Sequence, residues 1–409
     1  SQATLSATGA DVVLAGKLSN DANTVGIIKE GTGTLKLTND NSSYRGKTTI
    51  KEGNLAISEA KNLGGKVLVE LAGGGLNLLD SMTIGGAAST DSIDITGTRG
   101  AINTATGTKS KLELAFKGQG LFVKEGEGEL ILSGTNTEFS GGVSIDKGIL
   151  TITKDDSLGK KDTTVILNGG TLQTEGVTAL NRDVQLNQDS TIKNNGASTV
   201  GLNRLQGNYA VTLEGAEGSD GGFNLKAKID ETTDPDTVID INQHNGTILK
   251  NTTVIIGNDA DLGKSTGQLA FENGATLAVE IAPIKKDEDD DSIRNINIRN
   301  MSVEGTGNFL TVNNENAALD KFNVTLGVLS GKGDITKKGT GNLILDKNNK
   351  DYKGTLTISD GIVYVNKDNA LGVGTAAFGN NVTLTTLAAT NSTNNIGLNG
   401  ALSIDGQTF

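Results

Sequence analysis

The sequence predicts an all-β fold, a parallel β-helix built as a single-stranded solenoid, and three observations lead to this prediction. Apolar residues alternate with polar ones in short runs such as Leu35/Leu37 and Leu55/Ile57, so each run buries one face of a strand. Gly, Asn, Asp and Ser separate these runs and favour turns. One pattern of glycines also recurs along the chain, as expected of a fold made from stacked coils.

The composition fits a solenoid with an aliphatic interior. The chain has 409 residues, including 56 Gly, 2 Pro, 9 Phe and 4 Tyr, and it lacks Cys and Trp, so Leu, Ile and Val must fill the core. The formal net charge of −12 repels a phosphate backbone. We therefore expect no nucleic-acid partner.

Three copies of one motif align without a gap, at residues 29–64, 124–159 and 337–372. In each copy five glycines follow one another at steps of 2, 13, 7 and 11 residues. No helix and no Gly-Lys-Ser/Thr sequence follows them, so they are not phosphate-binding loops, and we interpret them as structural corners. These repeat positions are Gly31, Gly33, Gly46, Gly53, Gly64, Gly126, Gly128, Gly141, Gly148, Gly159, Gly339, Gly341, Gly354, Gly361 and Gly372.

Apolar positions keep step with the glycines and favour a β-helix over an antiparallel sandwich. An aromatic residue recurs at Tyr44, Phe139 and Tyr352, and aliphatic pairs recur at fixed offsets around it. A sandwich is usually marked by two-residue hairpin turns and aromatic core residues, which are scarce here. Aliphatic side chains that recur at one position per coil are expected to stack in ladders inside a β-helix.

The motif resembles the passenger-associated transport repeat of bacterial autotransporter proteins. It reads "KEGTGTLKL", "KEGEGELIL" and "KKGTGNLIL" at the start of the three copies. The resemblance implies a right-handed parallel β-helix that a C-terminal outer-membrane β-barrel of the same precursor exports from a Gram-negative bacterium. Because no barrel strands occur here, we expect residues 1–409 to be one continuous passenger fragment of a longer protein. The abundance of Asn, Lys and Ile is similar to that of large rickettsial surface antigens.

Few residues of the sequence suggest a catalytic or metal-binding site. His244 is the single histidine, and without a Cys nucleophile or a Gly-Asp-Ser-Gly segment it is predicted to be a polar turn residue rather than a catalytic base. Residues 230–240 and 283–292 are predicted loop excursions. The acidic run 287–291 could offer oxygen ligands to Ca²⁺, but its spacing is not that of an EF-hand, so cation binding there stays open. We predict no catalytic residue, no metal site and no cofactor, and the sequence does not identify binding residues.

We therefore expect a non-enzymatic, monomeric passenger, displayed on the bacterial surface or secreted. Its solenoid would present loops for virulence-associated adhesion to an unidentified host-cell protein or extracellular matrix. The glycine-leucine repeats would assist folding and export, because each coil can template the next. The alternative is a β-helical carbohydrate-active lyase or hydrolase, although the sequence lacks Trp and has few Tyr on which sugar rings could stack.

Overall fold

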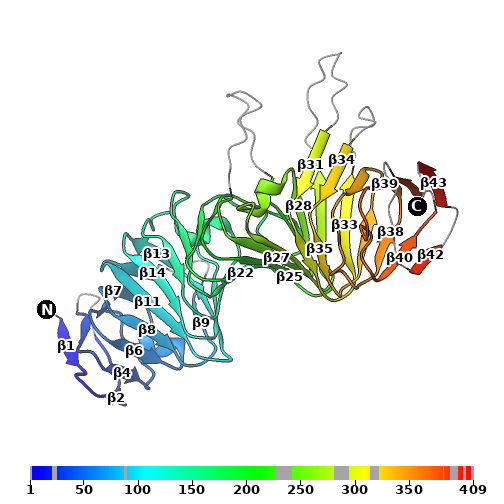
Figure 1. Ribbon diagram of the computed structural model, residues 1–409. Coiled ribbons are helices and arrows are strands. Elements are labelled where there is room, and N and C mark those ends of the chain that lie inside the picture. The colour runs from blue at the N-terminus through cyan, green and yellow to red at the C-terminus, as the bar shows by residue number, and fades with distance from the viewer. Residues whose placement is uncertain are drawn as a thin grey trace, which may run out of the picture. The chain divides into compact units, whose positions relative to one another are not determined.

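The computed structural model confirms the all-β solenoid, in which strands of successive coils lie side by side and parallel (Figure 1). The chain divides into two compact units, Ser1–Lys193 and Asn194–Phe409. That one continuous solenoid runs through both units stays a prediction. The structure describes residues 2–20, 25–86, 90–226, 242–280, 294–313, 322–380, 382–386, 395–398 and 402–406.

The described strands of the first unit form three parallel sheets, each taking one strand from a coil. The first sheet runs in the order β1 (Ala3–Ser6), β3 (Ile27–Glu30), β5 (Thr48–Ile50), β7 (Leu68–Leu71), β10 (Ser92–Ile95) and β13 (Ala115–Gly118). The second runs β2 (Val12–Leu14), β4 (Thr34–Leu37), β6 (Asn54–Ile57), β8 (Gly75–Leu78), β11 (Arg99–Thr104), β14 (Leu121–Glu125), β16 (Val143–Ile145), β18 (Val165–Leu167) and β21 (Val184–Leu186). The third runs β9 (Thr83–Gly85), β12 (Lys109–Glu113), β15 (Glu129–Leu132), β17 (Ile149–Ile152), β19 (Thr171–Thr174) and β22 (Ser190–Asn194), and β20 (Ala179–Leu180) is a further short strand.

The second unit repeats this construction. One sheet runs β23 (Val200–Leu202), β26 (Gly222–Asn224), β28 (Thr253–Ile256), β30 (Thr276–Glu280), β33 (Asn308–Asn313), β36 (Ile335–Lys338), β38 (Leu356–Ile358), β40 (Thr375–Phe378) and β42 (Asn395–Leu398). Another runs β25 (Val211–Gly215), β27 (Gly246–Lys250), β29 (Gln268–Glu272), β32 (Met301–Val303) and β35 (Leu329–Gly331). The last runs β31 (Arg294–Ile298), β34 (Phe322–Leu326), β37 (Asn342–Leu345), β39 (Gly361–Val365), β41 (Val382–Thr386) and β43 (Leu402–Gly406), and β24 (Leu205–Gly207) is a further short strand.

The core consists of ladders of aliphatic side chains from successive coils. Leu35, Leu55 and Leu76 pair in register, and none is more than 3% exposed. In the second unit Leu277 pairs in the same way with Leu310. Since paired strands lie about 4.8 Å apart, each side chain packs on the equivalent side chain of the next coil. The apolar residues that alternate along each strand, such as Leu35 and Leu37, therefore point into the interior of the solenoid.

Three single-turn 3₁₀-helices close coils where the chain changes direction. They are η1 (Ala60–Leu63), η2 (Asp155–Leu158) and η3 (Asp259–Leu262). A buried leucine ends each turn, and a glycine with positive φ follows it. The first two belong to repeat copies, whereas η3 has no repeat glycines before it. It marks a related coil that the glycine pattern did not reveal.

The repeat glycines serve two steric needs. The first, fourth and fifth glycine of every copy have φ between 58° and 123°, a region that side chains disfavour. The second and third do not, but their backbones touch the preceding coil. A Cβ at Gly141 would overlap the carbonyl oxygen of Gly120, and a Cβ at Gly354 would overlap that of Gly333. Backbone freedom and close approach between coils thus explain different members of one pattern.

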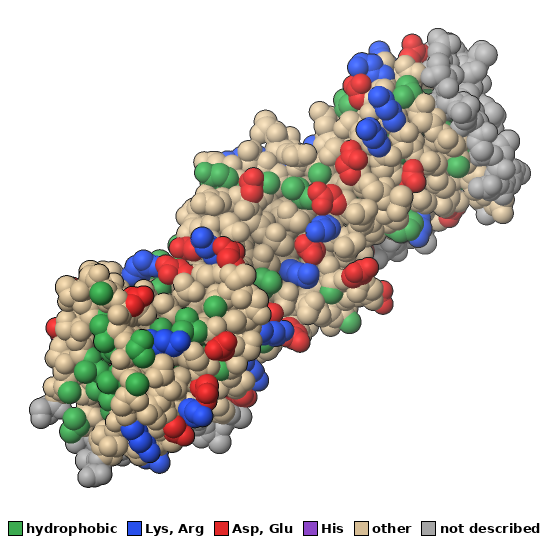
Figure 2. Space-filling model, turned by 90° about the horizontal axis from the view of Figure 1, so that it is seen from below, with side chains coloured by type: hydrophobic (Ala, Val, Ile, Leu, Met, Phe, Trp, Pro, Cys, Tyr) green, Lys and Arg blue, Asp and Glu red, His purple; other side chains and the backbone are tan. Residues whose placement is uncertain are grey.

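The charged residues are spread over the surface. On the face shown in Figure 2, Lys and Arg side chains alternate with Asp and Glu. Exposed pairs join neighbouring coils, as Lys51 does with Glu30 at 2.9 Å. Such pairs add little stability because water screens them.

Replacing Gly141 by Ala should destabilise the first unit by about 2 kcal/mol or more, since the new methyl group cannot fit without separating two coils. Urea unfolding followed by circular dichroism would measure the loss. Gly86→Ala is the control, because a Cβ there meets nothing within 4 Å and φ is not positive. Equal stability of the two variants would contradict the close-approach explanation.

Candidate functional site

Each repeat buries a lysine two residues before its first glycine. These lysines are Lys29, Lys124 and Lys337, and none is more than 1% exposed. Lys124 is in register with Ile102 on one side and Ile145 on the other. A side chain with an ammonium group therefore occupies a position in an aliphatic ladder. Burial of such a group is costly unless hydrogen bonds compensate it.

Backbone carbonyl groups provide those hydrogen bonds in the second repeat. Lys124 Nζ donates to the carbonyl oxygens of Glu125 at 2.8 Å, Gly126 at 2.7 Å and Lys147 at 3.2 Å. Glu125 and Gly126 follow the lysine at the corner, whereas Lys147 lies on the next coil. We call such a set of backbone carbonyls around one buried ammonium group a carbonyl cage.

The first repeat has the same arrangement. Lys29 Nζ donates to Glu30 at 3.0 Å, Gly31 at 2.6 Å and Glu52 at 3.0 Å, again with the third carbonyl on the next coil. In the third repeat, Lys337 Nζ donates to the carbonyls of Gly339 and Asp360. The motif letter K in the sequence therefore marks a cage in all three copies, a role that the sequence analysis did not assign to it.

Burial lowers the pKa of Lys124 to about 8, although the carboxylates of Glu127 and Glu125 act in the opposite direction. Burial also lowers the pKa of Lys337 to about 8, opposed by Asp360. At neutral pH both side chains are still mostly protonated. Each ammonium then has three N–H donors. Lys124 uses them on three carbonyls, whereas Lys337 bonds to two.

A buried asparagine ten residues after the first glycine spans three coils. Asn136 Oδ1 accepts from the backbone N–H of Phe116 at 2.9 Å, and its Nδ2 donates to the carbonyl of Ser157 at 2.5 Å. Asn349 bonds to Leu329 and Ala370 in the same manner. The identical offset of this residue in the copies was visible in the sequence, but asparagine is so common here that its role was missed.

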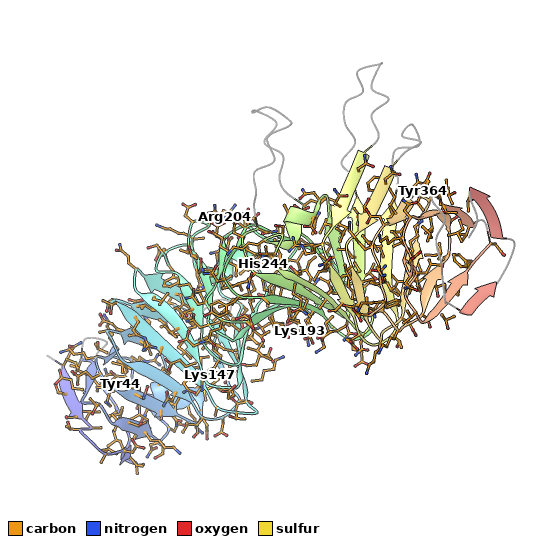
Figure 3. The ribbon with its side chains drawn as sticks, viewed as in Figure 1. Tyr44, Lys147, Lys193, Arg204, His244 and Tyr364 are labelled. Atoms are coloured by element: carbon orange, nitrogen blue, oxygen red, sulfur yellow. The ribbon has the colours of Figure 1, made fainter. Side chains whose placement is uncertain are left out.

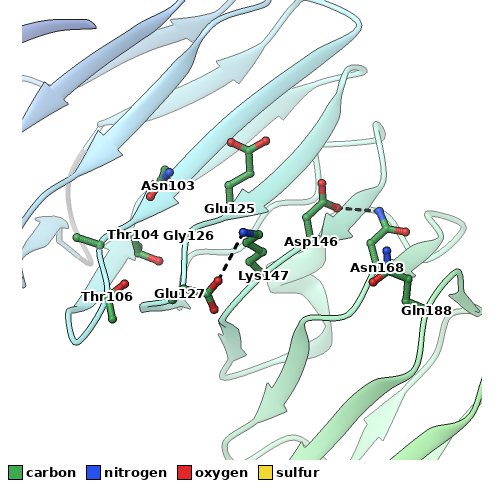
Figure 4. Close-up of a pocket in the computed structure, with 11 residues that line it drawn as sticks. Asn103, Thr104, Thr106, Glu125, Gly126, Glu127, Asp146, Lys147, Asn168 and Gln188 are labelled. Atoms are coloured by element: carbon green, nitrogen blue, oxygen red, sulfur yellow. Dashed lines mark hydrogen bonds and ion pairs between the residues drawn. The ribbon is translucent and has the colours of Figure 1, made fainter. Parts of the chain in front are cut away.

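A shallow groove of about 840 Å³ lies beside the corner at Gly126 (Figure 4). Glu125, Gly126 and Lys147, whose carbonyls form the cage, line it. Polar side chains of neighbouring coils, such as Asn103 and Asn168, complete the lining. The groove is therefore a surface depression with a largely polar wall.

The carboxylates of the groove are engaged by partners. Glu127 pairs with Lys147 at 3.6 Å, and Asp146 Oδ1 accepts from Asn168 Nδ2 at 2.8 Å (Figure 4). Glu125 pairs with Arg99 on a neighbouring coil. This arrangement can hydrogen-bond a polar ligand. It does not pair a nucleophile with a base among the residues that line the groove.

His244 lies among the strands of the second unit and is fully buried (Figure 3). Its Nε2 is 2.7 Å from Thr247 Oγ1, and the hydroxyl of Thr247 donates to the carbonyl of Leu262. Because the hydroxyl proton of Thr247 is donated to Leu262, the Nε2–H group of His244 must be the donor to Thr247 Oγ1. His244 therefore ties a loop between strands to the end of η3, and its burial keeps a substrate from reaching it.

Burial, together with the positive charges of Arg299 and Lys264, lowers the pKa of His244 to about 4. Arg299 is itself buried against η3, where its Nε donates to Asp259 at 3.0 Å. The first unit has a counterpart, Arg182, which bonds to Asp155 on η2 at the same distance. These arginines act as clasps on the 3₁₀-helices.

Within the residues that the structure describes, no group of three or more His, Cys, Asp and Glu side chains is placed to hold a metal ion. The predicted excursions 230–240 and 283–292, with the acidic run 287–291, lie outside the described residues. No helix in the described part of the chain is long and apolar enough to cross a bilayer.

Acid should destabilise the second unit through His244. The unfolded chain takes up a proton near pH 6.5 while the folded one resists until about pH 4, so stability is complete above 6.5 and is lost as the pH falls through that window. The loss should reach about 3 kcal/mol. His244→Gln, unfolded in urea at pH 7, 5 and 4 beside the wild type, should lose less stability on acidification. Parallel losses in both proteins would refute the assignment.

Comparison with known proteins confirms the repeats. Residues 27–57, 122–152 and 335–365 match the family described as the passenger-associated transport repeat. Over 128 residues the chain is 38% identical to the adhesin BmaC autotransporter of Brucella suis biovar 1 (strain 1330). That stretch is 31% of this chain but only 4% of the relative. No solved structure matches the chain. The chain thus carries three passenger-associated transport repeats on a parallel β-solenoid, and together these support an autotransporter passenger.

Proposed function

We propose that this chain is part of a non-enzymatic passenger that is displayed on the bacterial surface or secreted, and that adheres to a host-cell protein or extracellular matrix. The observation that carries the proposal is the matched repeat, present in three copies on a parallel solenoid. The similarity to a protein named an autotransporter adhesin supports the adhesive role. The partners would be a host component and the C-terminal outer-membrane β-barrel of the same precursor.

The geometry suits a scaffold that displays its loops. Within each unit, described coils pair through parallel strands, and their interior is a stack of aliphatic ladders. A frame of this kind tolerates changes in loops because the ladder positions, not the loops, hold the coils together. Adhesive contacts would therefore lie in surface loops, and a monomer would suffice to present them.

The repeats would assist folding and export. A coil that is already folded offers a strand edge to the next segment, which can then dock without a long search. In the repeats the corners fit so closely that Gly128 and Gly148 admit no side chain. Coil docking at these places would oppose backward movement of the chain through an export pore. The engaged carboxylates of the groove do not favour the carbohydrate-active alternative at that place.

The folded chain should bind saturably to host cells or to surfaces coated with matrix proteins, and heat denaturation should abolish this binding. A plate assay with labelled protein measures both. Incubation of the same protein with polysaccharides, followed by a reducing-sugar assay, tests the alternative. Hydrolysis of a glycan without any binding to cells or matrix would reverse the proposal.

Gly339→Val with Gly341→Val in the full-length precursor should lower the amount of passenger at the surface severalfold. Valine is strained at φ +81°, and a Cβ at Gly341 would press on the side chain of Val312. Surface protein is measured by antibody labelling of intact cells, with Gly86→Val as the control in open space. Undiminished export together with undiminished protease resistance would argue against the role of the repeats.

A further inference from the structure

The lysine of each repeat interrupts an aliphatic ladder. Ile102 and Ile145 flank Lys124, and Leu310 and Ile358 flank Lys337. Leucine or isoleucine would fill the same position without the cost of burying a charge. All three lysines nevertheless have the same burial and the same type of partner. The position therefore has a task that an aliphatic side chain cannot perform.

The partners of the lysine come from two coils. In the second repeat, Glu125 and Gly126 belong to the corner next to the lysine, whereas Lys147 arrives with the following coil. The separation is 23 residues in all three copies, from Lys124 to Lys147, from Lys29 to Glu52 and from Lys337 to Asp360. A cage is therefore complete only after the next coil has docked.

The fourth glycine of each repeat allows this approach. A Cβ at Gly148 would overlap the carbonyl oxygen of Gly126, and a Cβ at Gly361 would come within 2.6 Å of Lys337 Nζ. The following corner thus packs directly on the cage. The spacing of lysine and glycines in the motif is explained if both serve the same contact between coils.

We propose that the buried lysine of each repeat is a latch, whose primary ammonium group occupies a cage of backbone carbonyls from two consecutive coils and holds those coils together. The proposal deepens the folding role proposed above and rests on it for any consequence in export. The latch itself is a property of the folded chain and can be tested without cells.

Two substitutions test the latch in the purified chain. Lys124→Met keeps the length of the side chain but removes all three donors, and Lys124→Ala removes the side chain beyond Cβ. Amide hydrogen exchange followed by mass spectrometry should show about tenfold or faster exchange in residues 122–152, because charged hydrogen bonds are lost. Residues 335–365 of the same molecules retain Lys337 and serve as the internal reference.

The control variant is Lys147→Ala. The side chain of Lys147 is 65% exposed at the edge of the groove, and its backbone carbonyl, which belongs to the cage, is retained. Exchange in residues 122–152 should not change in this variant. If Lys124→Met exchanges as slowly as the wild type, the ammonium holds nothing and the proposal is wrong.

Chemical rescue distinguishes a cage for an ammonium group from a loss of packing. n-Propylammonium chloride, which replaces the atoms missing in Lys124→Ala, should restore most of the slow exchange, because its ammonium group can again donate to the cage carbonyls. Tetramethylammonium chloride has the same charge but no N–H donor and should not restore it. Equal effects of the two salts would overturn the proposal.

Should Lys124→Ala fail to fold, its refolding in the two salts becomes the readout, and refolding in n-propylammonium alone supports the latch. Equal refolding in both salts, or failure in both, contradicts it. A chain whose latch variants exchange normally but are not exported would refute the latch and leave the proposed role of the repeats intact.

Discussion

The parallel, in-register stacking of coils is the constraint on which the rest of the structure depends. Leu35 pairs with Leu55 and Leu55 with Leu76, so every coil must return to the same place in the ladder. Because strands of neighbouring coils lie about 4.8 Å apart, the corners between them must approach to the same distance. Side chains inside the coil and backbone at its corners are therefore subject to one spacing.

The close spacing of the coils explains both the glycines and the lysines of the repeat. Glycine is required where a corner turns with positive φ, as at Gly126, and where one corner lies against another, as at Gly141. Close approach also gathers carbonyl oxygens, which need donors once they are buried. Lys124 supplies those donors from inside the coil. Asn136 supplies further hydrogen bonds at the long loop on the way to the next corner.

Many polar side chains of this fold hydrogen-bond to other parts of the solenoid. Several buried polar side chains of the described residues, including His244 and the two clasp arginines, hold coils and 3₁₀-helices together. Two carboxylates of the groove, Glu127 and Asp146, are paired with side chains of neighbouring coils. A solenoid whose polar side chains hold its own coils together is suited to displaying variable loops. This agrees with the proposed passenger role.

The sequence by itself determined the all-β class, the parallel solenoid and the positions of the repeats, because alternation such as Leu130/Leu132 and the glycine spacing are local patterns that recur. Only the tertiary structure decided what the polar members of those patterns do. Lys124 and Lys36 are both lysines next to alternating apolar residues, yet one is buried and the other is not. Alternation separates the two, because Lys36 lies out of phase with the inward Leu35 and Leu37 whereas Lys124 lies in phase with Phe122. It does not show which carbonyls of the following coil meet the ammonium of Lys124. That coil lies more than 20 residues away, and no local pattern shows where its carbonyl oxygens point.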